Sequence, residues 1–282
     1  MSNNYISIYA KSFNWAGFFL PKKIFFKCSD LYDFCRTVDN IADENGDLDI
    51  KKKKFLDFKN NFINKNYNNQ IIKQMWALIE RFGISIEIIK DLFDGIESDL
   101  KEIVQLNSNK DLLIYSYRVA GTVGLMMAKI LNVQNENALK SAIDLGIAMQ
   151  LTNISRDVVE DSKNNRYYIS HNFKSIRETL KTADLFYESS FAGIKEIPFS
   201  FRFSILVARR IYKKIGHNIL KKENIENYNN SGKIYVTNFG KIIQTILSIY
   251  DLIRLLLIKP QDHLRDKEHQ IINEEININE RR

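Results

Sequence analysis

The feature that most restricts the fold of this chain is how rarely its helical patterns are interrupted: 282 residues contain only 3 Pro and 11 Gly. We find no series of short alternating strands joined by hairpin turns, whereas apolar residues recur at helical spacing over long stretches. A chain of this length can bury about three quarters of the surface that its unfolded form exposes. The sequence therefore predicts an all-α fold with a sizeable core.

The predicted helices are separated by short polar segments. They run from Lys22 to Glu44, Ile50 to Lys65, Gln70 to Phe82, Ile86 to Val104, Asp111 to Leu131, Glu136 to Asp161, Ile176 to Ala192, Ser200 to Lys222 and Lys233 to Ile258. No linker or repeat divides the chain before Lys259. We therefore expect one helical domain over residues 1–259, followed over residues 260–282 by a polar tail or a surface helix.

The charge of the chain limits its partners. A formal net charge of +7 and a pI near 9.1 favour an anionic partner, which could be nucleic acid, acidic lipid headgroups or a phosphorylated small molecule. No nucleic-acid-binding motif accompanies the basic residues, so we do not expect nucleic acid. The run from Lys51 to Lys54 is expected to be solvated surface.

Cysteine and histidine usage gives no sign of a metal site or a disulfide framework. Cys28 and Cys35 have no His or Cys nearby at metal-ligand spacing, so we expect reduced core residues in a cytoplasmic protein. No apolar run before Lys23 is long enough for a signal-peptide core, and we do not expect export. The histidines are scattered, are expected at the surface and receive no role; they are His171, His217, His263 and His269.

The most hydrophobic stretch runs from Ile242 to Ile258. Asp251 and Arg254 interrupt it, which disfavours a membrane span and favours an amphipathic helix. A core helix of the bundle is the favoured interpretation, and a helix lying against a bilayer is the alternative.

Two polar stripes stand out within otherwise apolar helices. The first consists of Tyr32, Arg36, Asp39 and Asp43, whose spacings of four, three and four place them on one face of a helix. Its neighbours are mostly apolar, so the stripe is embedded in hydrophobic surface. Two aspartates at i and i+4 repel each other unless a cation neutralises them.

The second stripe repeats this arrangement with Gln150, Asn153, Asp157 and Asp161, beside Arg156. If the two helices face each other, each close pair of carboxylates costs roughly 3 kcal/mol at about 5 Å with an effective dielectric constant near 20. Oxygen ligands that leave coordination positions open suit Mg²⁺, which completes its shell with phosphate oxygens. The two stripes together therefore predict diphosphate chemistry.

The segment between the stripes, from Tyr115 to Met127, is a helical pattern with two interior glycines. Each glycine costs about 1 kcal/mol relative to alanine, so either close helix packing or room for a ligand should compensate. Tyr115, Val119, Thr122 and Met126 share one face of an α-helix and could line an apolar tunnel.

These segments together resemble the phytoene/squalene synthase family. The similarity rests on Lys11-Ser12-Phe13 with Leu20-Pro21, on Tyr32 to Glu44, on Tyr115 to Met127, and on Ala142 to Asp161 followed by Asn165-Arg166-Tyr167-Tyr168. The sequence from Asp144 to Asn153 most resembles that of bacterial phytoene synthases. Gly232-Lys233 stands where related sequences usually carry arginine, and Ile169-Ser170 where they continue into Leu-Pro.

The resemblance implies a single-domain helical bundle around a deep central cavity. It also implies head-to-head condensation of two isoprenyl diphosphates through a cyclopropylcarbinyl diphosphate, with Mg²⁺, or Mn²⁺ in its place, and without a nicotinamide cofactor. The favoured product is 15-cis-phytoene from two geranylgeranyl diphosphates, in carotenoid biosynthesis. The alternatives are a squalene or dehydrosqualene synthase using farnesyl diphosphate, and a non-catalytic assembly factor, which would be free to lose the aspartates.

The resemblance also assigns roles to residues. The metal ligands would be Asp39, Asp43, Asp157 and Asp161; Arg36, Gln150, Asn153, Tyr212 and Lys233 would position diphosphate; and Tyr32 and Tyr115 would lie near the developing carbocation. The remaining substrate-binding residues would be Ser12, Phe13, Val119, Val123 and Arg156. Peripheral contact with the inner face of the membrane and with downstream carotenoid enzymes is a further expectation.

Overall fold

Side-chain caps fix where many of the helices begin. The Asn69 side chain accepts hydrogen bonds from the amides of Ile71 and Ile72, and Asn135 accepts one from Ala138. Such caps satisfy backbone donors that have no partner within the helix. The computed structural model describes residues 11–44, 46–258 and 266–281.

The described residues form a bundle of helices with one very short sheet. In the first half lie α2 (Lys11–Gly17), α3 (Lys22–Asp43), α4 (Leu48–Ile63), α5 (Gln70–Phe82), α6 (Ile86–Glu97), β1 (Val104–Gln105), α7 (Asn109–Ser116), the π-helical turn η1 (Tyr117–Gly121) and α8 (Thr122–Ile130). In the second half lie α9 (Glu136–Lys163), β2 (Arg166–Tyr167), α10 (Phe173–Gly193), the 3-10 turn η2 (Ile194–Glu196), α11 (Phe199–Leu220), α12 (Ile225–Asn230), α13 (Asn238–Leu257), α14 (Lys267–Glu275) and the 3-10 turn η3 (Ile278–Arg281).

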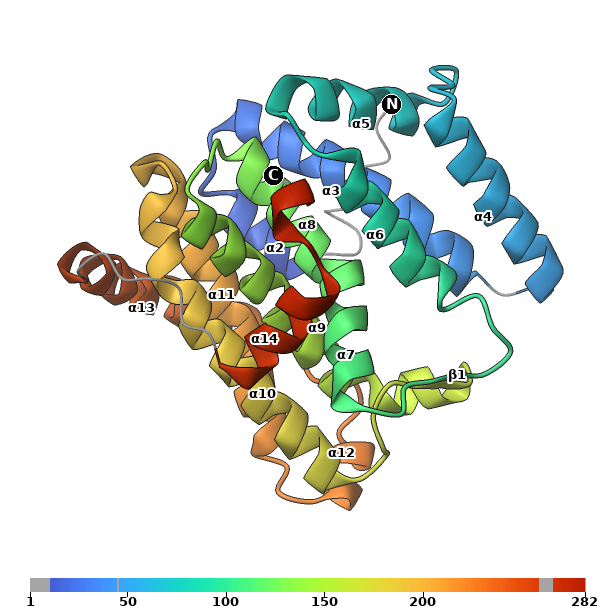
Figure 1. Cartoon of the computed structure of the whole chain (residues 1–282). Helices are drawn as coiled ribbons and strands as arrows, with labels where there is room; N and C mark the ends of the chain where they lie inside the picture. Colours follow the sequence, from blue (N-terminus) through green and yellow to red (C-terminus); the bar gives the residue numbers. More distant parts are fainter. Residues whose placement is uncertain (1–10, 45, 259–265, 282) are drawn as a thin grey trace.

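Helix α9 is the centre of the bundle. It packs against η1, α8, α10 and α11, and α3 closes the other side through contacts with α4, α5, α6 and α8 (Figure 1). Half of its residues, 14 of 28, are buried, and they come from several faces of the helix, which explains why its sequence is apolar on most faces. The predicted all-α bundle is confirmed, and the helix predicted from Gln70 to Phe82 is confirmed at both ends.

The helix predicted from Ile86 to Val104 is too long. Helix α6 ends at Glu97, and Val104 belongs to β1, which pairs in parallel with β2 so that Val104 lies opposite Arg166. The pairing partner is more than sixty positions away, so local periodicity could not reveal it. This contact ties the end of α6 to the segment that follows α9.

The segment predicted as one helix from Asp111 to Leu131 is interrupted by the π-helical turn η1. Its two glycines serve close packing: a Cβ at Gly124 would lie 2.2 Å from the carbonyl oxygen of Ala142, and one at Gly146 would lie 2.2 Å from that of Ala120. The backbones of α8 and α9 therefore touch where no side chain fits. Gly124 also lines the central cavity, so the glycine both permits close helix packing and leaves room for a ligand.

The last long helix does not match its prediction. Helix α13 begins at Asn238, so Lys233 lies in the preceding loop, and most of the large apolar side chains of α13 are exposed. The favoured interpretation of Ile242 to Ile258 as a core helix is therefore wrong. Among the described helices, none combines the length and apolar character needed to cross a bilayer.

The C-terminal residues pack onto the bundle. Helix α14 contacts α7, and η3 contacts α6. His269 is 1% exposed, and its Nε2 lies 3.2 Å from Asp144 Oδ2 and 3.1 Å from Ser189 Oγ. The expectation of a surface position is wrong for His269, whereas His171 and His217 are exposed. His263 and the expected domain boundary at residues 259 and 260 lie outside the described residues.

Candidate active site

A central cavity of about 1580 Å³ lies between α3, η1, α8, α9 and α11. One part of its wall carries carboxylate, guanidinium and amide groups, and the rest is largely apolar. The structure brings every predicted site residue to this wall, namely Ser12, Phe13, Tyr32, Arg36, Asp39, Asp43, Tyr115, Val119, Val123, Gln150, Asn153, Arg156, Asp157, Asp161, Tyr212 and Lys233. Their individual roles remain predictions.

The first aspartate pair belongs to α3 and is held by two arginines. Arg36 Nη1 pairs with Asp39 and lies 3.5 Å from Asp43 Oδ2. Arg166, on β2, places Nη1 at 2.5 Å from Asp43 Oδ1 and donates from Nη2 to the carbonyl oxygen of Ala42 at 3.1 Å. The sheet register that aligns Arg166 with Val104 thus delivers a guanidinium to the end of α3.

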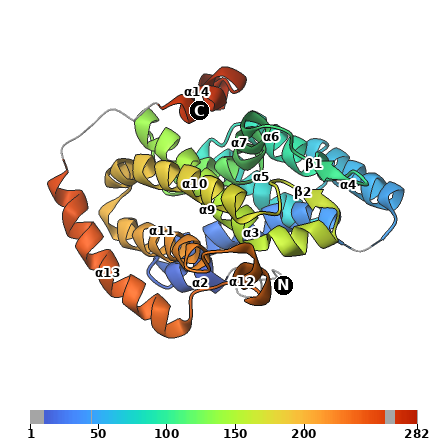
Figure 2. The same cartoon turned by 90° about the horizontal axis from the view of Figure 1, so that it is seen from below.

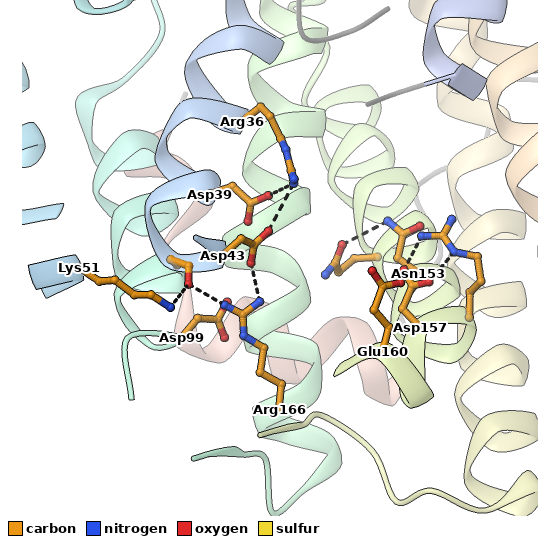
Figure 3. Close-up of polar contacts among 12 residues, drawn as sticks. Arg36, Asp39, Asp43, Lys51, Asp99, Asn153, Asp157, Glu160 and Arg166 are labelled. Atoms are coloured by element: carbon orange, nitrogen blue, oxygen red, sulfur yellow. Dashed lines mark hydrogen bonds and ion pairs between the residues drawn. The ribbon is translucent and has the colours of Figure 1, made fainter. Parts of the chain in front are cut away.

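The second pair belongs to α9. Arg156 holds Asp157 through two hydrogen bonds, from Nε at 2.8 Å and from Nη2 at 2.5 Å. Lys233 Nζ lies 2.7 Å from Glu160 Oε2 and 3.5 Å from Asp157 Oδ1. Figure 3 shows the α3 cluster and the α9 cluster as two separate groups, with Arg166 and Asp99 beside the first.

Burial and mutual repulsion perturb both pairs. Burial and then the neighbouring Asp43 raise the pKa of Asp39 to about 7. The Asp39 side chain keeps 37% of its surface exposed, so solvent in the cavity screens part of this effect. Burial and then Asp157 raise the pKa of Asp161 to about 7. Both pairs therefore carry more negative charge than their surroundings readily stabilise.

The residues present fit a divalent cation. In the described part of the chain, no three His, Cys, Asp or Glu side chains are grouped closely enough to hold a metal ion in this conformation. Arginines pair with Asp39, Asp43 and Asp157. The donor set nevertheless consists of carboxylate oxygens on two facing helices, which is the chemistry that Mg²⁺ and Mn²⁺ prefer. Burial and then repulsion from a neighbouring aspartate raise the pKa values of Asp39 and Asp161, and a bound cation would oppose both effects.

A buried cluster that the sequence did not single out lies at the same wall. Tyr115 Oη donates to Asp99 Oδ2 at 2.7 Å, and Tyr168 Oη donates to Asp99 Oδ1 at 2.9 Å. The two rings stack with centroids 4.7 Å apart. Burial and then Asp99 raise the pKa of both tyrosines, so they stay protonated at neutral pH. Asp99 is 7% exposed and sets the orientation of Tyr115.

The π-helical turn changes which side chains face the cavity. A regular α-helix would place Thr122 and Met126 on the same face as Tyr115 and Val119. Instead, Thr122 and Met126 are buried in packing, and Val123 and Met127 line the cavity. A π-helical turn has i to i+5 hydrogen bonds and adds one residue to the register, which accounts for the shift. The prediction for Thr122 and Met126 is wrong, and that for Val123 stands as a cavity position.

The comparison with known proteins identifies the family. The squalene/phytoene synthase family model matches residues 7–173, which is more than half of the chain. The chain belongs to the squalene/phytoene synthase family. The resemblance inferred from its motifs is thereby confirmed.

Individual family members agree with this assignment. The phytoene synthase of Rhodobacter capsulatus is 30% identical over 236 residues, covering 74% of this chain and 69% of that protein. The 15-cis-phytoene synthase of Pantoea ananas is 27% identical over 244 residues, covering 75% and 79%. The crystal structure of a dehydrosqualene synthase in complex with ligand is 25% identical, with a TM-score of 0.73 over 89% of this chain and 94% of that chain.

Several polar residues of this family member lie in the cavity wall although no role was predicted for them, among them Asp99, Arg166 and Tyr168. Arg166 and Tyr168 belong to a quoted motif, which was the available signal, but only the paired strand places them beside Asp43 and Asp99. Asp99 had no signal, because its position was assigned to a continuous helix. Lys51 also lines the cavity and donates to Ala42, so the run from Lys51 to Lys54 is not entirely solvated.

Proposed function

We propose that this chain condenses two molecules of geranylgeranyl diphosphate head to head to form phytoene. The C1–O bond of one allylic diphosphate breaks, and the electron pair leaves with the diphosphate. The C2–C3 double bond of the second substrate attacks the resulting cation, and loss of a proton closes a cyclopropylcarbinyl diphosphate. This intermediate ionises, rearranges and loses a second proton, so the overall reaction requires no nicotinamide reductant.

The observation that carries the proposal is that both aspartate pairs and a long apolar wall share one cavity. Typical small-molecule sites enclose about 300–1,000 Å³, and this cavity of about 1580 Å³ exceeds that range. Burying a twenty-carbon tail contributes up to roughly 16 kcal/mol before the costs of binding, at about 0.8 kcal/mol per carbon. Two such tails require a large apolar wall beside a polar one.

The chain's own residues divide the work by chemistry. Arg36, Arg156 and Lys233 offer donors for diphosphate oxygens, and Gln150 and Asn153 offer amide groups on the same wall. Tyr32 and Tyr115 place neutral hydroxyl groups at the cavity, and burial raises the pKa of each further above its ordinary value. The apolar wall around Val119 and Val123 keeps water from the cation. Tyr212 lies close enough to Arg156 and Asp157 for their charges to act on it, so it would help position diphosphate, and Ser12 and Phe13 line the cavity as further substrate-binding residues.

Asp39, Asp43, Asp157 and Asp161 would hold the divalent cation. When bound, the cation neutralises the departing diphosphate. Because Arg36, Arg156 and Arg166 engage these carboxylates, substrate binding requires the arginines to turn from aspartate toward phosphate. In the free protein the arginines therefore neutralise the carboxylates, and in the complex they donate hydrogen bonds to the diphosphate.

A synthase acting on farnesyl diphosphate is the second candidate. The similarity to a dehydrosqualene synthase structure, with a TM-score of 0.73 at 25% identity, favours it. Both reactions use the same polar wall, and they differ in the length of tail that the cavity accepts. The reaction class is common to both candidates.

The product determines where the protein works. A hydrocarbon without polar groups is not released into water, so we propose a cytoplasmic enzyme in peripheral contact with the inner face of the membrane. Enzymes that desaturate the product would take it from the same bilayer. The non-catalytic alternative is disfavoured, because all four aspartates are retained and line the cavity.

Product identification tests the proposal. Purified protein is incubated in detergent with Mg²⁺ and either labelled geranylgeranyl or labelled farnesyl diphosphate, and the hydrocarbon is analysed by chromatography and mass spectrometry. We expect phytoene from the longer substrate. If only farnesyl diphosphate gives a product, the second candidate is correct and the proposal is wrong. If neither substrate gives a product, the reaction class is refuted.

A further inference from the structure

The faces of α13 are reversed relative to those of an ordinary surface helix. Its buried positions are mainly polar, namely Lys241, Gln244, Ser248, Asp251 and Leu255. Its exposed apolar positions are Phe239, Ile242, Ile243, Ile246, Leu247, Ile249, Tyr250, Ile253, Leu256 and Leu257, each between 39% and 79% exposed. At about 100° per residue, these positions occupy an arc of about 180°. Soluble surface helices place their apolar stripe toward the core instead.

The polar face of α13 is fixed to the bundle by specific contacts. Arg210 donates to both carboxylate oxygens of Asp251, and Trp15 Nε1 donates to Thr245 Oγ1 at 3.0 Å. Helix α13 packs against α11 and η2, and Figure 2 shows it along the margin of the molecule, where no other described helix lies on its outer side. The orientation of α13 is therefore set by buried polar pairs, and it turns the apolar face outward.

The apolar surface extends beyond α13. The contact between Trp15 and Thr245 places α2 beside α13, and Phe18, at the end of α2, is 77% exposed. Phe19 packs edge-on against Phe203 of α11. Monomeric soluble proteins rarely expose contiguous apolar patches larger than a few hundred Å². We call the exposed residues of α13 together with Phe18 the outer apolar face.

Most charged side chains near this face are basic, although Glu196 of η2, the turn that packs against α13, is exposed. The single acidic residue of α13, Asp251, is 3% exposed and paired with Arg210, whereas Arg254 is exposed. Lys22 and Lys23 are also exposed, and they begin α3 shortly after the end of α2. An isologous dimer through this face would bring equal charges together. An anionic bilayer instead complements them, because basic residues beside an apolar helix face favour acidic headgroups.

The elements that carry the outer apolar face also contribute to the wall of the cavity. The residues that lead into α13, from Ile234 to Asn238, line the cavity, and so does Lys241 in its first turns. Ala16 and Gly17 of α2 line it as well, next to the exposed Phe18. The cavity and the outer apolar face therefore share α2 and the start of α13.

We propose that the outer apolar face docks the protein on an anionic lipid bilayer, with α13 lying in the plane of the interface. The proposal deepens the proposed function, on which it rests in one respect: the bilayer would receive the hydrocarbon directly from the cavity. About half of each apolar side chain on α13 would leave water on docking. The bilayer covers a face that the bundle leaves open.

Vesicle flotation tests the docking. The full-length chain, without substrate, is floated with vesicles of equimolar phosphatidylcholine and phosphatidylglycerol, and with vesicles of phosphatidylcholine alone. We expect the protein to float with the anionic vesicles and less with the neutral ones. The double variant I246E/I253E should reduce the bound fraction by about tenfold or more, because each change replaces burial of an isoleucine by burial of a charge.

The matched control is L56E/I63E on α4. Leu56 and Ile63 are 55% and 60% exposed, against 59% and 53% for Ile246 and Ile253, so the variants add equal charge at equally exposed apolar positions. Equal vesicle binding by the two variants, or no binding by the unaltered chain, would overturn the proposal. Light scattering that finds a dimer lost only in I246E/I253E, without flotation, would assign the face to a second copy and overturn it as well.

Two measurements keep this test independent. Hydrogen exchange on the unaltered chain should slow between residues 238 and 257 when anionic vesicles are added, and unchanged exchange there would contradict the docking even if a variant unfolds. Turnover of I246E/I253E in detergent should equal that of the unaltered chain, because neither residue lines the cavity. Flotation uses no substrate, so failure of the condensation assay would leave its outcome unaffected.

Discussion

Arg166 Nη1 lies 2.5 Å from Asp43 Oδ1, joining residues 123 positions apart in the sequence. The guanidinium lies at the C-terminal end of α3. Burial raises the pKa values of Asp39, Asp99 and Asp161, and the charge of Arg166 opposes part of that rise. Arg166 thus substitutes in the free protein for part of the positive charge that a metal would supply.

Arg166→Ala should therefore destabilise the metal-free protein. We expect a loss of about 1–3 kcal/mol in the free energy of unfolding in EDTA, because carboxylates are left close together without their counterion. Excess Mg²⁺ should recover part of the loss. Urea denaturation measures both, with Arg177→Ala on the exposed side of α10 as the control. Equal stability of the two variants in EDTA would contradict this role.

Close contact between α8 and α9 gives a second prediction. Gly124→Ala should lower the free energy of unfolding by at least about 2 kcal/mol, because the added Cβ meets a backbone oxygen that cannot move without shifting α9. Gly216→Ala on α11 is the matched control, since its Cβ would meet the ends of two side chains, Leu180 at 3.1 Å and Thr152 at 4.0 Å, and no backbone atom within 4 Å. We expect the control to stay within about 1 kcal/mol of the unaltered chain. Similar losses in both would refute the packing argument.

Much of the fold could be predicted because its helices are long and strongly periodic. The bounds of α5 were predictable, since Asn69 caps one end and Gly83 adopts a left-handed conformation at the other. The π-helical turn was not, because its sequence satisfies α-helical periodicity and only tertiary packing adds the extra residue. The apolar pattern of α13 showed that the helix is amphipathic. It did not show which face packs against the bundle, because periodicity alone does not determine this.

The site was predictable to the extent that its residues share helices. The spacing of Asp39 and Asp43, and of Asp157 and Asp161, is a local property that the sequence displays directly. Asp99 was not predictable, because its partners Tyr115 and Tyr168 come from two other segments. Contacts formed between elements leave no spacing signal within either element.

The buried histidine of α14 gives a third prediction. His269→Ala should lower the free energy of unfolding by about 1–3 kcal/mol and expose residues 266–281 to proteolysis, because buried Asp144 and Ser189 lose a hydrogen-bonding neighbour. His217→Ala, at an exposed position on α11, should change stability by less than about 0.5 kcal/mol. If the variants were equally stable and equally resistant to protease, the contact would have no structural role.

The cysteines give a prediction about pH. Burial raises the pKa of both Cys28 and Cys35 to about 12, so at pH 8 only about one thiol in 10⁴ is ionised in the folded protein. Raising the pH toward 11 should increase alkylation about tenfold per unit, provided that the protein stays folded. Mass spectrometry after iodoacetamide treatment measures this, and urea-unfolded protein, with an ordinary thiol pKa, should react fully at pH 8. Rapid alkylation of folded protein at pH 8 would contradict it.

The most direct test of the account compares Asp39→Ala and Asp157→Ala with Asp57→Ala, an exposed change on α4. Turnover of labelled geranylgeranyl diphosphate with Mg²⁺ is measured alongside circular dichroism. The account predicts that both cavity variants stay folded and lose at least roughly 10³-fold in rate, while Asp57→Ala keeps full activity. Full turnover in either folded cavity variant would contradict the claim that the two aspartate pairs act together in one diphosphate site.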